Sequence, residues 1–125
     1  MTLDLNQYND QNIFAKIIRG ELPAQKLHED QYVVAFPDAN PQASIHILVI
    51  PKGRYTSFHD FSHKASPDEH QAFWKAISAL ANQHKLDETG YRLITNHGED
   101  SGQEVSHFHV HLVGGQPLGP LVTTI

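Results

Sequence analysis

The chain reads His107-Phe108-His109-Val110-His111-Leu112-Val113 close to its carboxyl end. Successive side chains of a β-strand point to opposite faces, so this stretch predicts three imidazoles on one face and apolar side chains on the other. The apolar face is expected to pack against a helix or the core, which leaves the histidines on the opposite surface. We expect this strand to begin near Val105 and to end at Gly114-Gly115.

Neighbouring segments have the composition of further strands. Residues 45–50 are β-branched and apolar except for His46, which predicts a central strand. Residues 32–36 form a short apolar run that we expect to pair with residues 26–28 as a hairpin. Residues 91–96 alternate partially and predict another strand.

Two segments have the periodicity of helices. Residues 13–19 predict a short amphipathic helix that a glycine and a proline end. Ser66 and Glu69 form the pattern of a capping box, and the apolar stripe that follows predicts a helix of about 20 residues lying on the sheet. We interpret the segment between Pro51 and Ser66 as a histidine-containing loop.

The composition limits the class of protein. With 125 residues, 39% of them hydrophobic and 18% charged, the chain predicts one domain, which we place at residues 13–125 after a flexible leader of residues 1–12. The absence of cysteine excludes disulfides, thiolate metal ligands and cysteine nucleophiles. A formal net charge of -5 argues against nucleic acid as a partner. The chain shows neither a basic targeting segment nor an apolar membrane span, so we expect a cytoplasmic protein with no membrane partner.

Ten histidines point to imidazole chemistry, and the alternating three admit three interpretations. They could be solvated surface residues, although their strict spacing argues against this. They could coordinate zinc, because histidines two residues apart on a strand can converge on one ion, but no cysteine or obvious carboxylate completes a site. A neutral imidazole could also attack phosphorus and form a phosphohistidine that water cleaves. We favour this third interpretation.

A glycine-containing loop precedes the histidine strand. Residues 96–104 include Gly98 and Gly102, whose backbone can adopt positive φ and approach a ligand closely. Amides of such a loop can form an anion-binding concavity beside the imidazoles. The sequence therefore predicts a phosphate site next to a nucleophile.

The His-x-His-x-His pattern, with apolar residues between and after, resembles the motif of the histidine triad (HIT) nucleotide-binding family. The similarity extends over about residues 12–121 and is greatest to the Hint branch and its bacterial members. The stretches that carry it are Ile13-Phe14-Ala15-Lys16-Ile17-Ile18-Arg19-Gly20-Glu21-Leu22-Pro23, Ala35-Phe36-Pro37-Asp38, Asn40-Pro41-Gln42-Ala43, Leu48-Val49-Ile50-Pro51, Gly90-Tyr91-Arg92, Gly102-Gln103-Glu104-Val105 and Gly114-Gly115-Gln116-Pro117-Leu118-Gly119-Pro120.

The resemblance implies a fold and an activity. The expected fold is α+β, an antiparallel five-stranded sheet with one long and one short helix, paired into a continuous sheet in a homodimer. The implied activity is hydrolysis of purine nucleoside phosphoramidates through a covalent nucleotidyl-histidine, with no metal or other cofactor. Alternatives are a Fhit-like dinucleoside polyphosphate hydrolase, a metal-binding protein, and a nucleotide-binding or scaffold protein whose hydrolytic activity is incidental.

The resemblance also implies roles for individual residues. His109 would be the nucleophile, His111 and His46 would contact the phosphate, and His107 would orient its neighbour. The expected nucleotide-binding residues are Asn96, Gly102, Gln103 and Glu104 for the phosphate, Asp38 for the ribose, and Ile13, Phe14, Ile17, Phe36 and Ala39 for the base.

Overall fold

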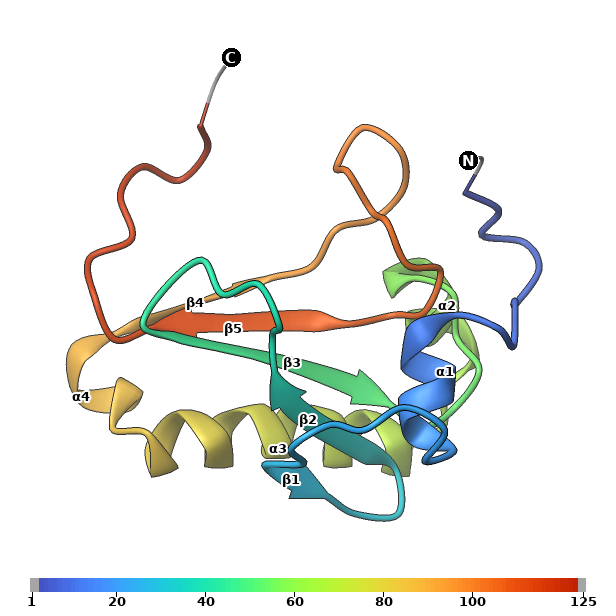
Figure 1. The fold of residues 1–125 in the computed structure, drawn as a ribbon, viewed down its shortest axis with the longest axis horizontal. Helices are drawn as coiled ribbons and strands as arrows, with labels where there is room; N and C mark the ends of the chain where they lie inside the picture. Colours follow the sequence, from blue (N-terminus) through green and yellow to red (C-terminus); the bar gives the residue numbers. More distant parts are fainter. Residues whose placement is uncertain (1–2, 124–125) are drawn as a thin grey trace.

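The computed structural model describes residues 3–123, and these residues form one five-stranded sheet and four helices (Figure 1). In chain order the elements are α1 (Ile13–Ile18), β1 (His28–Glu29), β2 (Val33–Pro37), β3 (Ile45–Pro51), α2 (Phe58–Lys64), α3 (Pro67–Gln83), α4 (Leu86–Thr89), β4 (Tyr91–Ile94) and β5 (Val110–Gly114). The expected α+β class is confirmed.

The strands lie in the order β1-β2-β3-β5-β4, and every neighbouring pair is antiparallel. The expected antiparallel five-stranded sheet is therefore confirmed. The strands β3 and β5 are neighbours, with His46 opposite Val113 and Leu48 opposite His111. This pairing brings histidines from two distant parts of the sequence onto adjacent strands.

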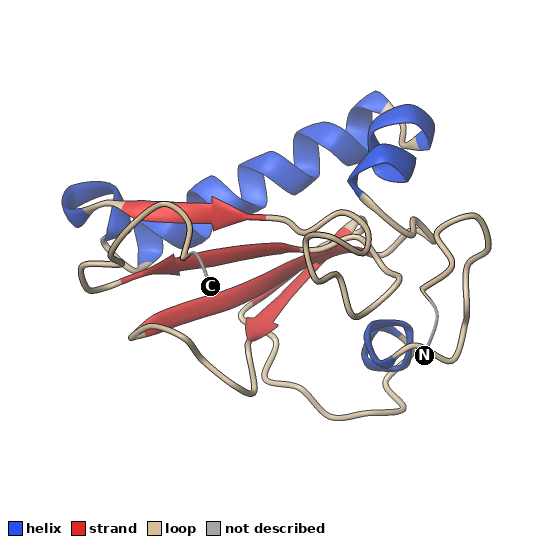
Figure 2. Cartoon of the chain, turned by 90° about the horizontal axis from the view of Figure 1, so that it is seen from above, coloured by secondary structure: helices blue, strands red, loops and turns tan. Residues whose placement is uncertain are grey.

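Helices cover both faces of the sheet (Figure 2). The larger core lies between the sheet and α3, and the smaller one lies under α1. Phe108, Val110 and Leu112 all belong to the larger core, as their alternation predicts. The smaller core contains Phe14, Ile17, Val34, Phe36, Leu48 and Ile50. The histidines between the apolar residues of β5 therefore face the side of α1.

The long helix α3 starts with the predicted capping box. The Ser66 hydroxyl accepts the N–H of Glu69, and the Glu69 carboxylate accepts the N–H of Ser66 at 3.0 Å. Phe73, Ile77 and Leu80 are buried along its inner face, so the predicted stripe packs on the sheet. Because α3 covers this face of the sheet, only the opposite face can carry a ligand site.

Two short helices were not expected, so the prediction of one long and one short helix is wrong. The segment after Pro51 was expected to be a loop, but α2 forms there. The Ser57 hydroxyl caps this helix by accepting the N–H of Asp60, and the buried Phe61 anchors it to the core. The four-residue α4 follows Lys85, whose φ of 60° turns the chain. Helices this short do not span enough turns to show a period in the sequence.

The start of the last strand also differs from the prediction. Pairing of β5 with β3 begins at Val110, opposite Val49, and not near Val105. The N–H of Phe108 donates instead to the carbonyl of Tyr55 at 2.7 Å, beyond the end of β3. His107 and His109 therefore lie just before the strand, His107 at the end of a bend over residues 105–107.

The described part of the leader, residues 3–12, lies against the segment that follows β3. The Thr56 hydroxyl donates to the carbonyl of Leu5 at 2.7 Å, and Arg54 forms an ion pair with Asp10 at 2.7 Å. These contacts bring the leader next to the histidine region.

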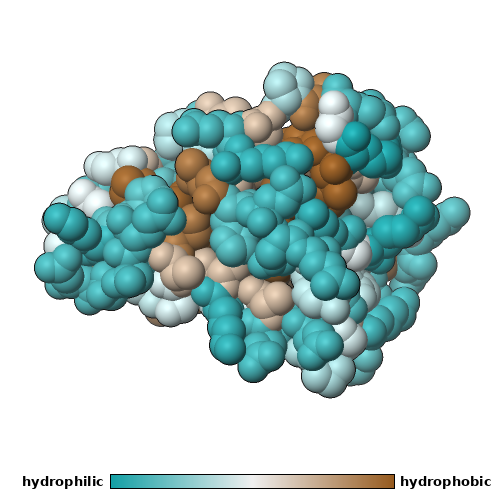
Figure 3. Space-filling model, turned by 90° about the horizontal axis from the view of Figure 1, so that it is seen from below, coloured by the Kyte–Doolittle hydropathy of each residue, from teal (hydrophilic) through white to brown (hydrophobic). Residues whose placement is uncertain are grey.

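Hydrophilic residues cover most of the face shown in Figure 3, and hydrophobic ones appear there in small groups. Among residues 3–123, none of the helices is both long and apolar enough to cross a membrane.

Candidate active site

A cavity of about 680 Å³ lies on the side of the sheet that faces α1. It is lined by all the residues expected at the site except Gln103 and His107. These lining residues are Ile13, Phe14, Ile17, Phe36, Asp38, Ala39, His46, Asn96, Gly102, Glu104, His109 and His111. The fold thus gathers residues from both ends of the chain and from its centre around one space.

His109 is held in a single tautomer. Its Nδ1 lies 2.7 Å from the carbonyl oxygen of His107, which can only accept, so Nδ1 carries the proton and donates it. Burial lowers the pKa of His109, which keeps the ring neutral at physiological pH. The lone pair is therefore on Nε2, the state that a nucleophilic imidazole requires.

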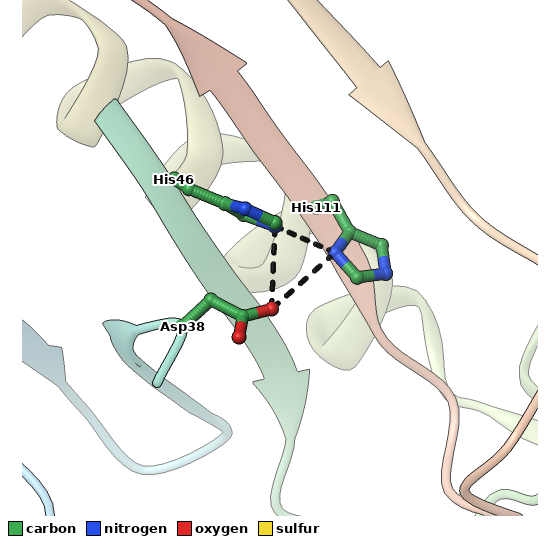
Figure 4. A group of neighbouring side chains, drawn as sticks. All are labelled: Asp38, His46 and His111. Atoms are coloured by element: carbon green, nitrogen blue, oxygen red, sulfur yellow. Dashed lines mark hydrogen bonds and ion pairs between the residues drawn. The ribbon is translucent and has the colours of Figure 1, made fainter. Parts of the chain in front are cut away.

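His46, His111 and Asp38 form a second hydrogen-bonded group (Figure 4). The N–H of Gln42 donates to Nδ1 of His46 at 2.9 Å, so Nε2 of His46 carries the proton. That proton is donated to Nδ1 of His111 at 2.9 Å, and Oδ2 of Asp38 lies 3.3 Å from the same His46 nitrogen. The remaining proton of His111 is consequently on Nε2, where it can be donated to an anion in the cavity.

The electrostatics of His111 agree with this assignment. Burial, followed by the neighbouring His109 and His46 rings, lowers the pKa of His111 to about 4. His111 therefore enters the site as a neutral donor, and the cavity presents one imidazole lone pair beside one imidazole N–H.

The same group is the only set within residues 3–123 whose ligand atoms come close enough to hold a metal ion. One ligand atom each of Asp38, His46 and His111 lies within 4.8 Å of the others. A cation at Nε2 of His46 would have to replace the proton donated to His111. Metal binding and the observed hydrogen bond therefore exclude one another.

His107 lies behind the cavity wall and is fully buried. Its Nε2 donates to the carbonyl of Pro51 at 2.8 Å, and the hydroxyl of Tyr8 lies 2.6 Å from its Nδ1. Burial lowers the pKa of His107 to about 4. This ring does not line the cavity but packs against Phe14, which does, and the carbonyl of the same residue orients His109.

Gln103 has a comparable supporting position. Its Oε1 accepts the N–H of Gly98 at 2.9 Å, and its Nε2 donates to the carbonyls of Thr56 at 2.9 Å and Val105 at 3.0 Å. Gln103 is buried and does not line the cavity. Gln103 ties the glycine loop, in which Gly98 and Gly102 have φ near 80°, to the body of the protein.

The apolar end of the cavity is built by α1 and β2. The Asn12 side chain accepts the N–H of Ala15 and so caps α1. Phe14 and Phe36 pack edge to face with ring centroids 5.9 Å apart, and the Phe14 ring also lies 5.0 Å from that of His109. An apolar slot therefore adjoins the imidazoles.

Sequence reasoning missed two contributors to this geometry. Gln42 supplies the N–H that sets the tautomer of His46, and Tyr8 contacts His107 from a segment 99 residues away. Gln42 belongs to one of the stretches that carry the family resemblance, but the sequence does not show that its N–H binds His46. No local pattern could have found Tyr8, because its contact depends on tertiary structure.

Comparison with known proteins gives a consistent result. Residues 19–118 match the model of the HIT domain. An uncharacterized HIT-like protein of Rickettsia prowazekii is 50% identical over 115 residues, which cover 92% of this chain and 96% of that protein. The protein named purine nucleoside phosphoramidase of Escherichia coli K12 is 42% identical over 116 residues, with coverages of 90% and 94%.

Solved structures show the same relationship. A histidine triad protein from Clostridium difficile superimposes with a TM-score of 0.83 at 40% identity, covering 93% of this chain and all of that one. The match to the HIT domain, the shared fold and the spacing of the three histidines thus all indicate the same family. This chain belongs to the HIT family.

Proposed function

We propose that this protein hydrolyses purine nucleoside phosphoramidates, of the adenosine 5'-monophosphoramidate type, through a covalent nucleotidyl intermediate on His109. The observation that carries the proposal is the neutral His109 ring, whose Nδ1 proton is fixed by the His107 carbonyl and whose Nε2 lone pair is free for attack. The relative named purine nucleoside phosphoramidase supports the choice of substrate.

The cavity offers a place for each part of the nucleotide. The apolar slot of Ile13, Phe14 and Phe36 suits the flat face of a purine. The Asp38 carboxylate, which lines the same cavity, can accept hydrogen bonds from ribose hydroxyls. Nε2–H of His111 can donate to a phosphate oxygen as negative charge develops there.

The reaction would proceed in two balanced steps. Nε2 of His109 attacks phosphorus, the phosphorus–nitrogen bond breaks, and its electron pair goes to the leaving nitrogen, which takes up a proton. Water then attacks the same phosphorus, loses a proton and displaces Nε2. The products are a nucleoside monophosphate and an amine, and His109 returns to its starting state.

A second hollow can receive the amine. It has a volume of about 270 Å³, shares His46, Asn96 and His111 with the cavity, and extends to Arg92 and Leu118. A phosphate placed beside His111 would direct its leaving group into this space. We therefore assign the leaving group to the side of β4 and the carboxyl-terminal tail.

The test is amine release from an adenosine phosphoramidate by the purified protein. His109→Ala should lose turnover while it retains nucleotide binding, and His59→Ala, which alters an exposed histidine outside the cavity, should behave as the unaltered protein. Mass spectrometry of the reaction quenched with denaturant at alkaline pH, where a phosphorus–imidazole bond survives, should detect nucleotide attached to His109. Faster cleavage of diadenosine polyphosphates than of phosphoramidates would reject the proposed substrate class, and full activity of His109→Ala would reject the nucleophile.

We further propose that two copies pair through β4 into one continuous sheet. This strand is at the edge of the sheet, and its side chains Tyr91 and Leu93 are 42% and 43% exposed. An edge strand with apolar side chains is a template for pairing with another chain. Sedimentation equilibrium should give a dimer that Leu93→Lys weakens, and a monomer at micromolar concentration would reject the pairing.

A further inference from the structure

We propose that Tyr8, in the leader, is a positioning residue for the nucleophile: its hydroxyl holds His107 in the one tautomer and orientation that aligns His109. This inference rests on the role proposed above for His109. Tyr8 lies outside residues 19–118, the part of the chain that matches the HIT domain, so the domain model assigns it no function.

The direction of the hydrogen bond follows from its surroundings. The carbonyl of Pro51 can only accept, so Nε2 of His107 carries the proton at the 2.8 Å contact. His107 is neutral because it is fully buried, and its Nδ1 is therefore an acceptor. The Tyr8 hydroxyl must donate across the 2.6 Å contact, and burial raises its pKa, which preserves the donor at neutral pH.

Tyr8 is itself held in place by the body of the protein. The guanidinium of Arg54 lies 5.0 Å from the centroid of its ring, and Arg54 also forms the ion pair with Asp10. The Thr56 hydroxyl binds the carbonyl of Leu5 a few residues earlier. The Tyr8 ring meets His107 edge to face with centroids 5.5 Å apart. Contacts at Leu5 before Tyr8 and at Asp10 after it therefore hold the segment that carries the hydroxyl.

The effect on His109 passes through one residue. The carbonyl of His107 accepts the Nδ1 proton of His109, and Phe14 packs against both rings, at 6.2 and 5.0 Å between centroids. Removing the Tyr8 hydroxyl would leave the buried Nδ1 of His107 without its donor. The ring would then seek another partner by tilting or by admitting water, and the carbonyl that orients His109 would move with it.

The test compares Tyr8→Phe with Tyr32→Phe. The second substitution also removes one hydroxyl, from a tyrosine that packs against the larger core between the sheet and α3. We expect Tyr8→Phe to lower kcat about tenfold with little change in KM, because one buried hydrogen bond is lost without loss of a substrate contact. Tyr32→Phe should leave both constants unchanged.

Nitrogen-15 spectra of the imidazoles supply a readout that does not depend on turnover. In the unaltered protein they should show His107 protonated at Nε2 only and His109 at Nδ1 only. In Tyr8→Phe the Nδ1 signal of His107 should shift and the Nδ1–H signal of His109 should broaden. If the unaltered protein cleaves no phosphoramidate, the proposed function fails, but these spectra still decide the role of Tyr8.

Two outcomes would overturn the inference. One is a Tyr8→Phe protein whose His107 and His109 signals match those of Tyr32→Phe. The other is a Tyr8→Phe protein that unfolds at lower temperature but retains the kcat of Tyr32→Phe, which would make the tyrosine purely structural.

Discussion

Gln103 supports the glycine loop without touching the cavity, and its replacement tests whether that support determines nucleotide binding. Gln103→Ala removes three hydrogen bonds, to Gly98, Thr56 and Val105, at distances of 2.9, 2.9 and 3.0 Å. At about 1 kcal/mol of net stability for each bond, the free energy of unfolding should fall by about 3 kcal/mol. The freed loop should also bind nucleotide about tenfold more weakly, because its amides are no longer preorganised.

A second substitution at the same position adds a pH signature. Gln103→Glu retains an acceptor for Gly98 but sets the other carboxylate oxygen against the carbonyls of Thr56 and Val105. With two carbonyl acceptors facing that oxygen and one N–H donor facing the other, the carboxyl should have a folded pKa above its unfolded value of about 4.3. Destabilisation should therefore be smallest below about pH 4, where the single carboxyl proton replaces one of the two amide donors, and should grow as pH rises through the two pKa values.

Urea denaturation and calorimetric titration with adenosine monophosphate measure both effects. Gln83→Ala, at the exposed end of α3, is the matched control and should change neither quantity. The reasoning is refuted if Gln103→Ala loses less than about 1 kcal/mol, or if it loses stability while its nucleotide affinity stays unchanged.

Three more predictions concern titration, the core and metal. Burial lowers the pKa of His107 to about 4 in the folded protein, so as pH falls the unfolded chain takes up this proton first. The neutral His107 ring should therefore contribute fully to the free energy of unfolding above about pH 6.5, and this contribution should decline by about 1 kcal/mol per pH unit down to about pH 4. Equal free energies of unfolding at pH 5 and pH 7 would contradict this prediction. Phe108→Ala removes a ring that stacks on Phe61 at 4.8 Å and contacts Phe73 at 5.2 Å, so it should reduce the free energy of unfolding by about 4 kcal/mol in urea denaturation. Excess EDTA should leave phosphoramidate hydrolysis unchanged, since the proposed nucleophile and donor are both imidazoles, whereas a loss that zinc restores would support the metal interpretation.

The sequence predicted those parts of the fold and site that depend on local pattern. Alternation in residues 107–113 separates Phe108, Val110 and Leu112 from the histidines, and the structure places the two sets on opposite faces. The capping box at Ser66 located the start of α3 to the residue. Both features are encoded by neighbours in the chain, so no tertiary information was needed.

The remaining features depend on partners that are distant in sequence. Residues 105–109 have the composition of a strand, but the pairing of β5 with β3 stops at Val110 and Val49 although β3 continues to Pro51, and the N–H of Phe108 bonds to the carbonyl of Tyr55 instead. The helix α2 exists because Phe61 fills the core beside Phe73 and Phe108, not because seven residues favour a helix by themselves. Gln103 and His107 belong to the sequence motifs that predict the site, yet only the packed structure shows that neither residue lines the cavity.

The order of the strands has a consequence for folding. His46 and His111 meet only when β3 pairs with β5, and nearly half of the chain lies between the two strands. Closing so long a loop is entropically unfavourable until the intervening helices have collapsed. We therefore expect the cavity to be completed late along the folding pathway, and a chain arrested before that step to be unable to bind its ligand.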